Sequence, residues 1–240
     1  MTLRKTFISI PLVALALTAC QGGSKKENIQ LVQSAGILKE AIWKKDLGSK
    51  IDADTLSTQH LYGVGPLVNL RGDQVIFNGK TYLSEVVNDS IITKEGKPTT
   101  SPYFVYQYVP KWIETPFSSD IENERELGIF VLSRKELNKQ RESSFKMEGT
   151  FKALEIAVHN LPAKLSHYNY SVGLIANKKH YLKDVEGTII GFFDAERTMK
   201  FTHHDEQIVM YFISKDLKQV GRVTQLHLDH DKTKFFLPKY

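Results

Sequence analysis

The feature that most constrains the fold is a pair of apolar segments near the C-terminus, joined by a short polar loop. Residues 207–213 and 221–228 are rich in Val, Ile, Phe, Tyr and Thr, which favour β-strands. If the segments fold symmetrically about the loop, Tyr211 lies opposite Arg222, and Val209 shares the face of Tyr211 because side chains alternate along a strand. The sequence therefore predicts an antiparallel hairpin that brings these three side chains together.

The rest of the chain predicts further strands and few helices. Residues 103–109 read as a strand, and Asn78-Gly79 is typical of the type I′ turn of a tight hairpin. Apolar residues at helical spacing predict a helix over 29–45, and a capping box at Ser133 predicts a short helix that ends at Arg141. Because strands dominate after these segments, the expected fold class is α+β, with mostly antiparallel β-sheets.

Residues 1–19 have the pattern of a bacterial lipoprotein signal peptide. Two basic residues precede an apolar run that is shorter than the roughly 20 residues of a spanning helix, and Leu17-Thr18-Ala19-Cys20 resembles a lipobox. Lipid on Cys20 and a polar linker over 20–28 would anchor a globular body to the bacterial cell envelope. Gln21, in place of an aspartate, favours the outer membrane. The alternative is an incidental cysteine in an ordinary signal peptide.

The composition excludes several classes of function. The formal net charge of +5 is mild and spread along the chain, so nothing indicates a nucleic-acid partner. Cys20 is the only cysteine, which excludes an intrachain disulfide. Glycine-rich phosphate loops, Gly-x-Ser-x-Gly elbows and His-Glu-x-x-His helices do not occur in the sequence. The groupings His203-His204-Asp205 and His227 to His230 are expected to lie on the solvated surface.

Several segments resemble the α-acetolactate decarboxylase family, in the same order and at compatible spacing. The runs Val209-Met210-Tyr211-Phe212 and Val220-Gly221-Arg222-Val223 resemble the family's His-x-His-Phe and Gly-Gly-His-Val. Residues 61–82 look like the family's stretch from Gly-Leu-Gly-Thr to Asp-Gly-Lys-Phe-Tyr, and residues 144–151 resemble the strand that leads to its catalytic arginine. Residues 185–193 are close to its Val-Glu-Gly-Thr-Leu-Val-Gly-Phe.

The resemblance implies where the family's functional residues fall in this chain. The positions of the three histidines that hold the family's catalytic zinc are taken by Val209, Tyr211 and Arg222. The family's metal-site glutamate falls on Asp73, a shorter carboxylate. Its catalytic arginine falls on Ala157 in an ungapped comparison, whereas a shift of two residues would place His159 there. The family's remaining catalytic glutamate has no counterpart that we can identify.

The resemblance also implies the organisation of the chain and its partners. Two closely packed halves, 29–143 and 144–240, are expected to enclose the family's site in the cleft between them. The expected partners are the membrane, through the lipid anchor, and a small carboxylate ligand. A homodimer is compatible with the sequence.

The substitutions at the zinc positions predict that the family's metal chemistry is absent. Valine offers no ligand, tyrosine is an uncommon zinc ligand, and arginine repels a dication. The expected function is that of a non-catalytic, acetolactate decarboxylase-like envelope lipoprotein without a cofactor. Its site would be plugged by an ion pair between Asp73 and Arg222, or Arg222 and Tyr211 would bind a small carboxylate. The alternatives are an active carboxy-lyase that converts 2-acetolactate to acetoin in a rebuilt site, and an interaction module.

Overall fold

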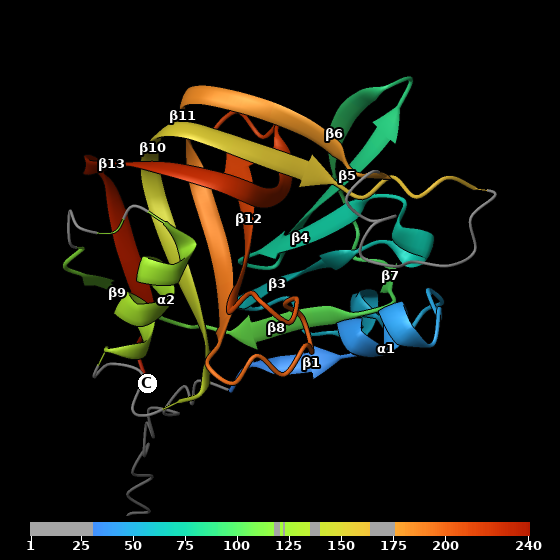
Figure 1. The fold of residues 1–240 in the computed structure, drawn as a ribbon, viewed down its shortest axis with the longest axis horizontal. Helices are drawn as coiled ribbons and strands as arrows, with labels where there is room; N and C mark the ends of the chain where they lie inside the picture. Colours follow the sequence, from blue (N-terminus) through green and yellow to red (C-terminus); the bar gives the residue numbers. More distant parts are fainter. Residues whose placement is uncertain (1–30, 118–120, 122, 135–139, 164–175) are drawn as a thin grey trace, which may run out of the picture.

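Two antiparallel sheets form the body of the protein (Figure 1). The structure, a computed structural model, describes residues 31–117, 121, 123–134, 140–163 and 176–240. In spatial order, the strands of the first sheet are β1 (Gln33–Ala35), β8 (Phe104–Tyr108), β3 (Leu61–Pro66), β4 (Asp73–Phe77), β5 (Lys80–Val87) and β6 (Ser90–Gly96). The predicted turn joins β4 to β5, because Asn78 and Gly79 both adopt the positive φ that a type I′ turn requires.

The second sheet is built mainly from long strands that close into a ring. In spatial order, its strands are β10 (Glu142–Val158), β11 (Lys178–Asp194), β12 (Ile208–Ser214), β13 (Val220–Pro238) and the short β9 (Trp112–Thr115). β10 pairs with both β11 and β13, which closes the ring. The ladder between β10 and β13 changes register beside Gly149, where φ is +144° and a Cβ would lie 1.9 Å from the carbonyl oxygen of Lys232. Only glycine fits there.

The two α-helices whose bounds fall within the described residues are short and precede the long strands in the chain, as predicted. The remaining elements of the described residues are α1 (Leu38–Trp43), α2 (Glu124–Leu132), the 3-10 turns η1 (Ala53–Thr55) and η2 (Val68–Leu70), and the paired strands β2 (Ile51–Asp52) and β7 (Thr100–Ser101). Within the part of the chain that the structure describes, every helix is too short or too polar to cross a bilayer. The fold class is α+β with mostly antiparallel sheets, as the sequence predicts.

Both helix predictions are wrong in their bounds. Part of the predicted helix over 29–45 is β1, which pairs with β8, and only Leu38–Trp43 is helical. Gly36 separates the two elements, because its φ is +66° and a Cβ there would lie 2.1 Å from the carbonyl oxygen of Pro102. Ser133 is the C-cap residue of α2, and Gln140 and Arg141, at the end of the second predicted helix, are not helical. Residues 135–139 of that second prediction lie outside the described residues.

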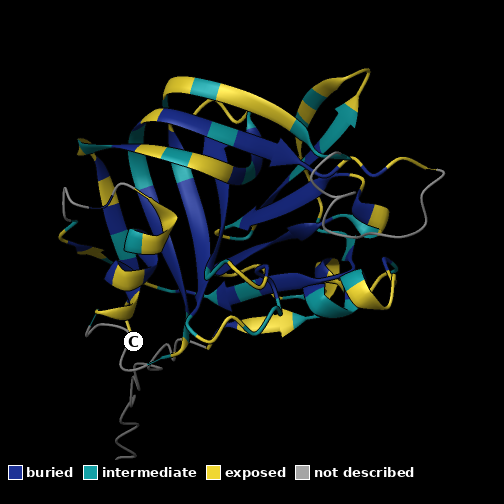
Figure 2. Ribbon diagram, in the orientation of Figure 1, coloured by how far each residue is buried: buried dark blue, intermediate teal, exposed yellow. Residues whose placement is uncertain are grey.

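Two hydrophobic clusters lie on opposite faces of the hairpin formed by β12 and β13. One is lined by α2 and by the ring strands, and it includes Phe212 and Phe235. The other lies between the two sheets, where Val75 of β4 and Tyr211 of β12 belong to the same cluster. Figure 2 shows β12 as buried along its whole length, whereas β13 includes exposed stretches. Because side chains alternate along β12, Val209 and Tyr211 both face the first sheet, and the predicted site lies at the interface between the sheets.

The predicted hairpin is confirmed in its register. Tyr211 pairs with Arg222, and on the other side of β13 Arg222 pairs with Ala157 of β10. Three of the positions that the resemblance singled out therefore lie side by side across neighbouring strands.

Candidate functional site

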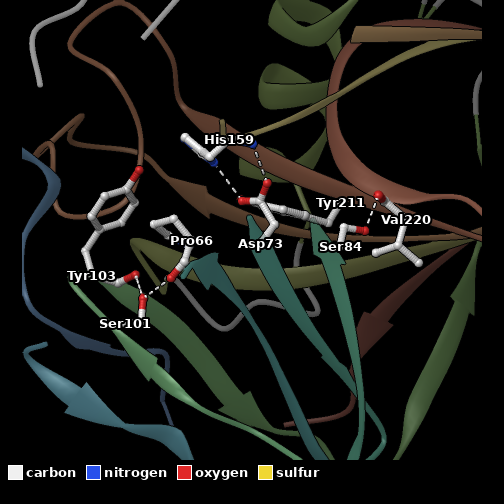
Figure 3. A network of polar contacts seen from close by, with 8 residues as sticks. All are labelled: Pro66, Asp73, Ser84, Ser101, Tyr103, His159, Tyr211 and Val220. Carbon is white, nitrogen blue, oxygen red and sulfur yellow. Dashed lines mark hydrogen bonds and ion pairs between the residues drawn. The ribbon is translucent and has the colours of Figure 1, made fainter. Parts of the chain in front are cut away.

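A fully buried carboxylate, Asp73, lies at the centre of the candidate site (Figure 3). The hydroxyl of Tyr211 donates a hydrogen bond to Oδ1 of Asp73 at 2.8 Å, and Nδ1 of His159 lies 2.7 Å from the same oxygen. The backbone N–H of His159 donates to Oδ2 at 2.9 Å. Because a carboxylate only accepts hydrogen bonds, we assign the ring hydrogen of His159 to Nδ1. Both oxygens of Asp73 are therefore satisfied by protein groups.

This polar cluster connects the two sheets. Asp73 is the first residue of β4 in the first sheet, Tyr211 lies in β12 of the second, and His159 follows directly after β10. A second cross-sheet contact lies close by, where the hydroxyl of Ser84 in β5 donates to the carbonyl oxygen of Val220 at 2.6 Å (Figure 3). Buried polar groups that are fully hydrogen-bonded hold neighbouring elements in one register. We call Asp73, His159 and Tyr211 the inter-sheet triad.

Tyr211 serves this triad as a hydrogen-bond donor. Burial raises the pKa of Tyr211 well above its usual value, and the adjacent charge of Asp73 raises it further. The phenol therefore keeps its proton at physiological pH. A phenol that keeps its proton is a poor metal ligand, and this proton is donated to Asp73, so Tyr211 acts as a structural donor in this position.

Arg222 forms its ion pair with Glu206 and not with Asp73, which corrects the ion pair expected from the sequence. Nη2 of Arg222 donates to Oε2 of Glu206 at 2.6 Å, and their side chains are 16% and 26% exposed. The Tyr211 hydroxyl, which the sequence assigns to a carboxylate pocket together with Arg222, donates its hydrogen bond to Asp73. An ion pair that keeps some contact with water loses less solvation than one with the fully buried Asp73, which explains this arrangement.

Two further titratable residues border Arg222. His203, expected at the surface, is buried, whereas its neighbour His204 is exposed. Burial and, to a smaller extent, the charge of Arg222 lower the pKa of His203 to about 4, so this imidazole is neutral. At the start of α2, burial raises the pKa of Glu124 to about 7, and the negative charge of Glu206 contributes to the rise. Arg222 thus lies among one neutral imidazole and two carboxyl groups.

Glu124 predicts a pH dependence of stability. The pKa of the Glu124 carboxyl rises on folding from 4.5 to about 7. The stability that this group contributes is therefore fully present below pH 4.5 and is lost as the pH rises through 7. Glu124 packs among other protein atoms but keeps surface in contact with water, which screens its charge. We therefore expect urea denaturation to give Glu124→Gln a free energy of unfolding about 1 kcal/mol higher than that of the parent chain at pH 8, and the same value at pH 4. Glu95→Gln, on the exposed strand β6, is the control. Equal stability of parent and Glu124→Gln at pH 8 would contradict this prediction.

The residues that the resemblance assigns to the family's metal positions do not fit a zinc ion. Val209 is buried and has no donor atom, Tyr211 is bound to Asp73, and Arg222 is a cation paired with Glu206. Among the described residues, no group of three or more His, Cys, Asp or Glu side chains is arranged to hold a metal. A catalytic zinc needs three protein ligands and an open position. The donors present here satisfy one another.

The structure brings together five of the residues considered at the sequence level and adds three more. Asp73, His159, Tyr211 and Arg222 lie at the site, with the buried Ala157 beside Arg222. Val209 is buried in the inter-sheet core. Cys20 lies outside the described residues. Sequence reasoning placed His203 at the solvated surface and did not single out Glu206 or Glu124. The apolar Phe201, two residues before His203, could have suggested that this segment is buried, and the structure shows both Phe201 and Thr202 as buried.

The sheets and the hairpin site define an acetolactate decarboxylase-like fold. The sequence model of the family "Alpha-acetolactate decarboxylase" matches residues 38–236, so the chain belongs to this family. A search of curated protein sequences finds no match.

Solved structures resemble the chain over most of its length. A Staphylococcus aureus protein of unknown function, described as similar to alpha-acetolactate decarboxylase, has 17% sequence identity and a TM-score of 0.68 over 88% of this chain and 86% of that one. Alpha-acetolactate decarboxylase from Bacillus subtilis strain 168 has 13% identity and a TM-score of 0.66, covering 87% and 84%. Acetolactate decarboxylase from Bacillus subtilis subspecies spizizenii has 14% identity and a TM-score of 0.69, covering 88% and 87%. At these identities the similarity concerns the fold.

Proposed function

We propose that this chain is a non-catalytic member of the acetolactate decarboxylase family, anchored by lipid to the outer membrane, that binds a small carboxylate at Arg222. The observation that carries the proposal is the inter-sheet triad, in which Asp73, His159 and Tyr211 satisfy one another. The resemblance assigns two of these residues, Asp73 and Tyr211, to the family's metal site. The lipobox at Cys20 supports the anchor.

The donor set supports the loss of the family reaction. As the carboxyl group of acetolactate leaves, the electron pair that remains needs a sink, which a metal can supply as a Lewis acid. Val209 and Arg222 cannot ligate a metal, and the Tyr211 hydroxyl is held by Asp73. Ala157, which the ungapped comparison assigns to the position of the family's arginine, offers no charge to stabilise the transition state; in the shifted comparison that position falls on His159, which is bound to Asp73.

Arg222 supports the binding of a carboxylate. A guanidinium presents a planar fork that matches the two oxygens of a carboxylate, and Arg222 already holds one carboxylate, that of Glu206. Glu206 lies near Glu124, and the two negative charges repel each other. Because Glu206 is partly exposed, its side chain can turn toward water when another carboxylate takes its place. Glu206 would then be an internal competitor of the ligand.

This competition predicts opposite effects of two substitutions on the binding of pyruvate, used as a probe. We expect Glu206→Gln to bind pyruvate roughly tenfold more tightly than the parent chain, since the competing charge is gone. Arg222→Lys keeps the charge but loses the fork, and should bind at least about tenfold more weakly than the parent. Isothermal titration calorimetry of the full chain in detergent measures both.

Two controls accompany this titration. Pyruvamide, which has no carboxylate, should not bind, and Arg125→Gln, which changes an exposed arginine in the first turn of α2, should bind pyruvate as the parent does. Circular dichroism establishes that each variant is folded. Pyruvate binding that is the same in the parent, Glu206→Gln and Arg222→Lys would overturn the assignment of Arg222.

A separate assay tests the loss of catalysis. The full chain, purified without chelator, is analysed for its metal content and incubated with 2-acetolactate. We expect substoichiometric zinc and acetoin formation at the rate of the uncatalysed control. Acetoin formation that is proportional to protein concentration, and that disappears in Asp73→Asn, would show an active decarboxylase with a rebuilt site.

A further inference from the structure

The N-terminal edge of the described structure carries an unusual concentration of exposed apolar side chains. Leu31, Ile37 and Trp43 are 52%, 37% and 65% exposed, and they are three of the ten exposed large hydrophobic residues in the described part of the chain. They lie just before β1, between β1 and α1, and at the end of α1. Figure 1 shows β1 and α1 following one another along the lower edge of the molecule, and Figure 2 shows exposed residues along both. We call residues 31–45 the N-terminal edge.

Basic side chains accompany these apolar residues. Nζ of Lys39 lies 4.4 Å from the centroid of the Trp43 ring, which places a cation against the most exposed aromatic residue of the edge. Lys44 is paired with Glu40, whereas the next residue, the exposed Lys45, adds a further positive charge. Tryptophan beside lysine is the combination that favours the boundary between lipid headgroups and acyl chains, particularly where the lipids are anionic.

The chain that precedes this edge places it near a bilayer if Cys20 carries lipid. Leu31 is eleven residues after Cys20. A polar linker of that length has a root-mean-square span of roughly 20 Å and cannot exceed about 40 Å. Tethering over such a distance gives an effective concentration in the millimolar range, so even a weak surface contact would be populated.

We infer that the N-terminal edge is a membrane-docking surface, on which Trp43, Ile37 and Leu31 enter the headgroup region and Lys39 and Lys45 meet anionic lipid phosphates. This inference rests on the lipid anchor of the proposed function. It extends that proposal, because an anchor alone would leave the body free to rotate, whereas a docked edge gives the body one orientation. The candidate site at Arg222 would then have a defined position relative to the bilayer.

Fluorescence quenching by brominated lipids tests this inference. The full chain is produced in a bacterial host that processes lipoproteins and is reconstituted in vesicles of phosphatidylethanolamine and phosphatidylglycerol with brominated acyl chains. The chain has two tryptophans, Trp43 and Trp112, and Trp43→Phe leaves only Trp112, in β9. We expect a roughly twofold loss of the Trp43 emission, obtained as the difference between the parent and Trp43→Phe, and little quenching of Trp112.

The outcomes separate the docking surface from the anchor. Failure of the chain to float with the vesicles would overturn the anchor and, with it, the docking. A chain that floats but shows no brominated-lipid quenching of Trp43 would overturn the docking alone. The Trp43 emission could instead change with the number of protein molecules per vesicle and not with bromination of the lipid. The N-terminal edge would then contact a second copy of the chain, and the inference would be wrong. The double substitution Lys39→Gln and Lys45→Gln should reduce the quenching in vesicles that contain phosphatidylglycerol and leave flotation unchanged.

Discussion

Asp73→Ala is expected to lower the free energy of unfolding by about 3–5 kcal/mol, because it leaves buried donors on the opposite sheet without their acceptor. Asp73 is fully buried and accepts from the Tyr211 hydroxyl and from the ring and backbone of His159. The loss exceeds that of an ordinary surface substitution because three groups lose their partner at once and a cavity remains. Urea denaturation of the full chain in detergent, followed by near-ultraviolet circular dichroism, measures the change.

Two controls separate the triad from the general effect of removing a carboxylate. Asp54→Ala removes an exposed carboxylate in η1 and should change stability by less than about 0.5 kcal/mol. Tyr211→Phe removes one donor and should cost about 1–2 kcal/mol. In the double variant of Asp73→Ala and Tyr211→Phe the combined loss should be smaller than the sum, since the two residues share one hydrogen bond. Strict additivity, or a loss at Asp73 below about 1 kcal/mol, would contradict the triad as a tie between the sheets.

The triple variant Val209→His, Tyr211→His and Arg222→His is expected to change the chain from one without stoichiometric zinc into one whose stability depends on zinc. Tyr211 and Arg222 are cross-strand partners, and Val209 lies on the same face of β12 as Tyr211. Imidazoles at these positions would face the carboxylate of Asp73, which the loss of the Tyr211 hydroxyl leaves available. Binding to the folded state alone stabilises it by about 4 kcal/mol when zinc is present at a thousand times its Kd.

Thermal unfolding of the triple variant with zinc and with a chelator measures this effect, and elemental analysis gives the stoichiometry. The double variant that retains Arg222 is the matched control, because a cation in the site should prevent binding. Without zinc, the triple variant should be less stable than the parent, since imidazoles replace packed side chains and Glu206 loses its partner. If the triple variant folds and its melting temperature does not respond to zinc, the backbone of the site has diverged along with its ligands.

Alternation of apolar side chains was the most informative property of the sequence. It predicted the hairpin of β12 and β13 and the pairing of Tyr211 with Arg222, because the two strands pair about a short polar loop and leave a single register. The turn at Asn78 and Gly79 was predictable for a similar local reason, since both residues tolerate positive φ. The helix bounds were not predictable, because the apolar spacing near the N-terminus suits both a helix and an edge strand, and only the pairing of β1 with β8 decides between them.

What the sequence determined by itself was part of the site, namely the hairpin residues Tyr211 and Arg222 and the carboxylate of Asp73. Which partner each polar side chain takes was decided only by the tertiary structure. Asp73 and His159 are 86 residues apart and lie on different sheets, so no local pattern could pair them. Arg222 binds Glu206 because the fold brings the segment before β12 to the end of the hairpin and leaves that pair partly in contact with water. Hydrogen bonding and desolvation depend on three-dimensional neighbours, whereas strand register depends on alternation along the chain.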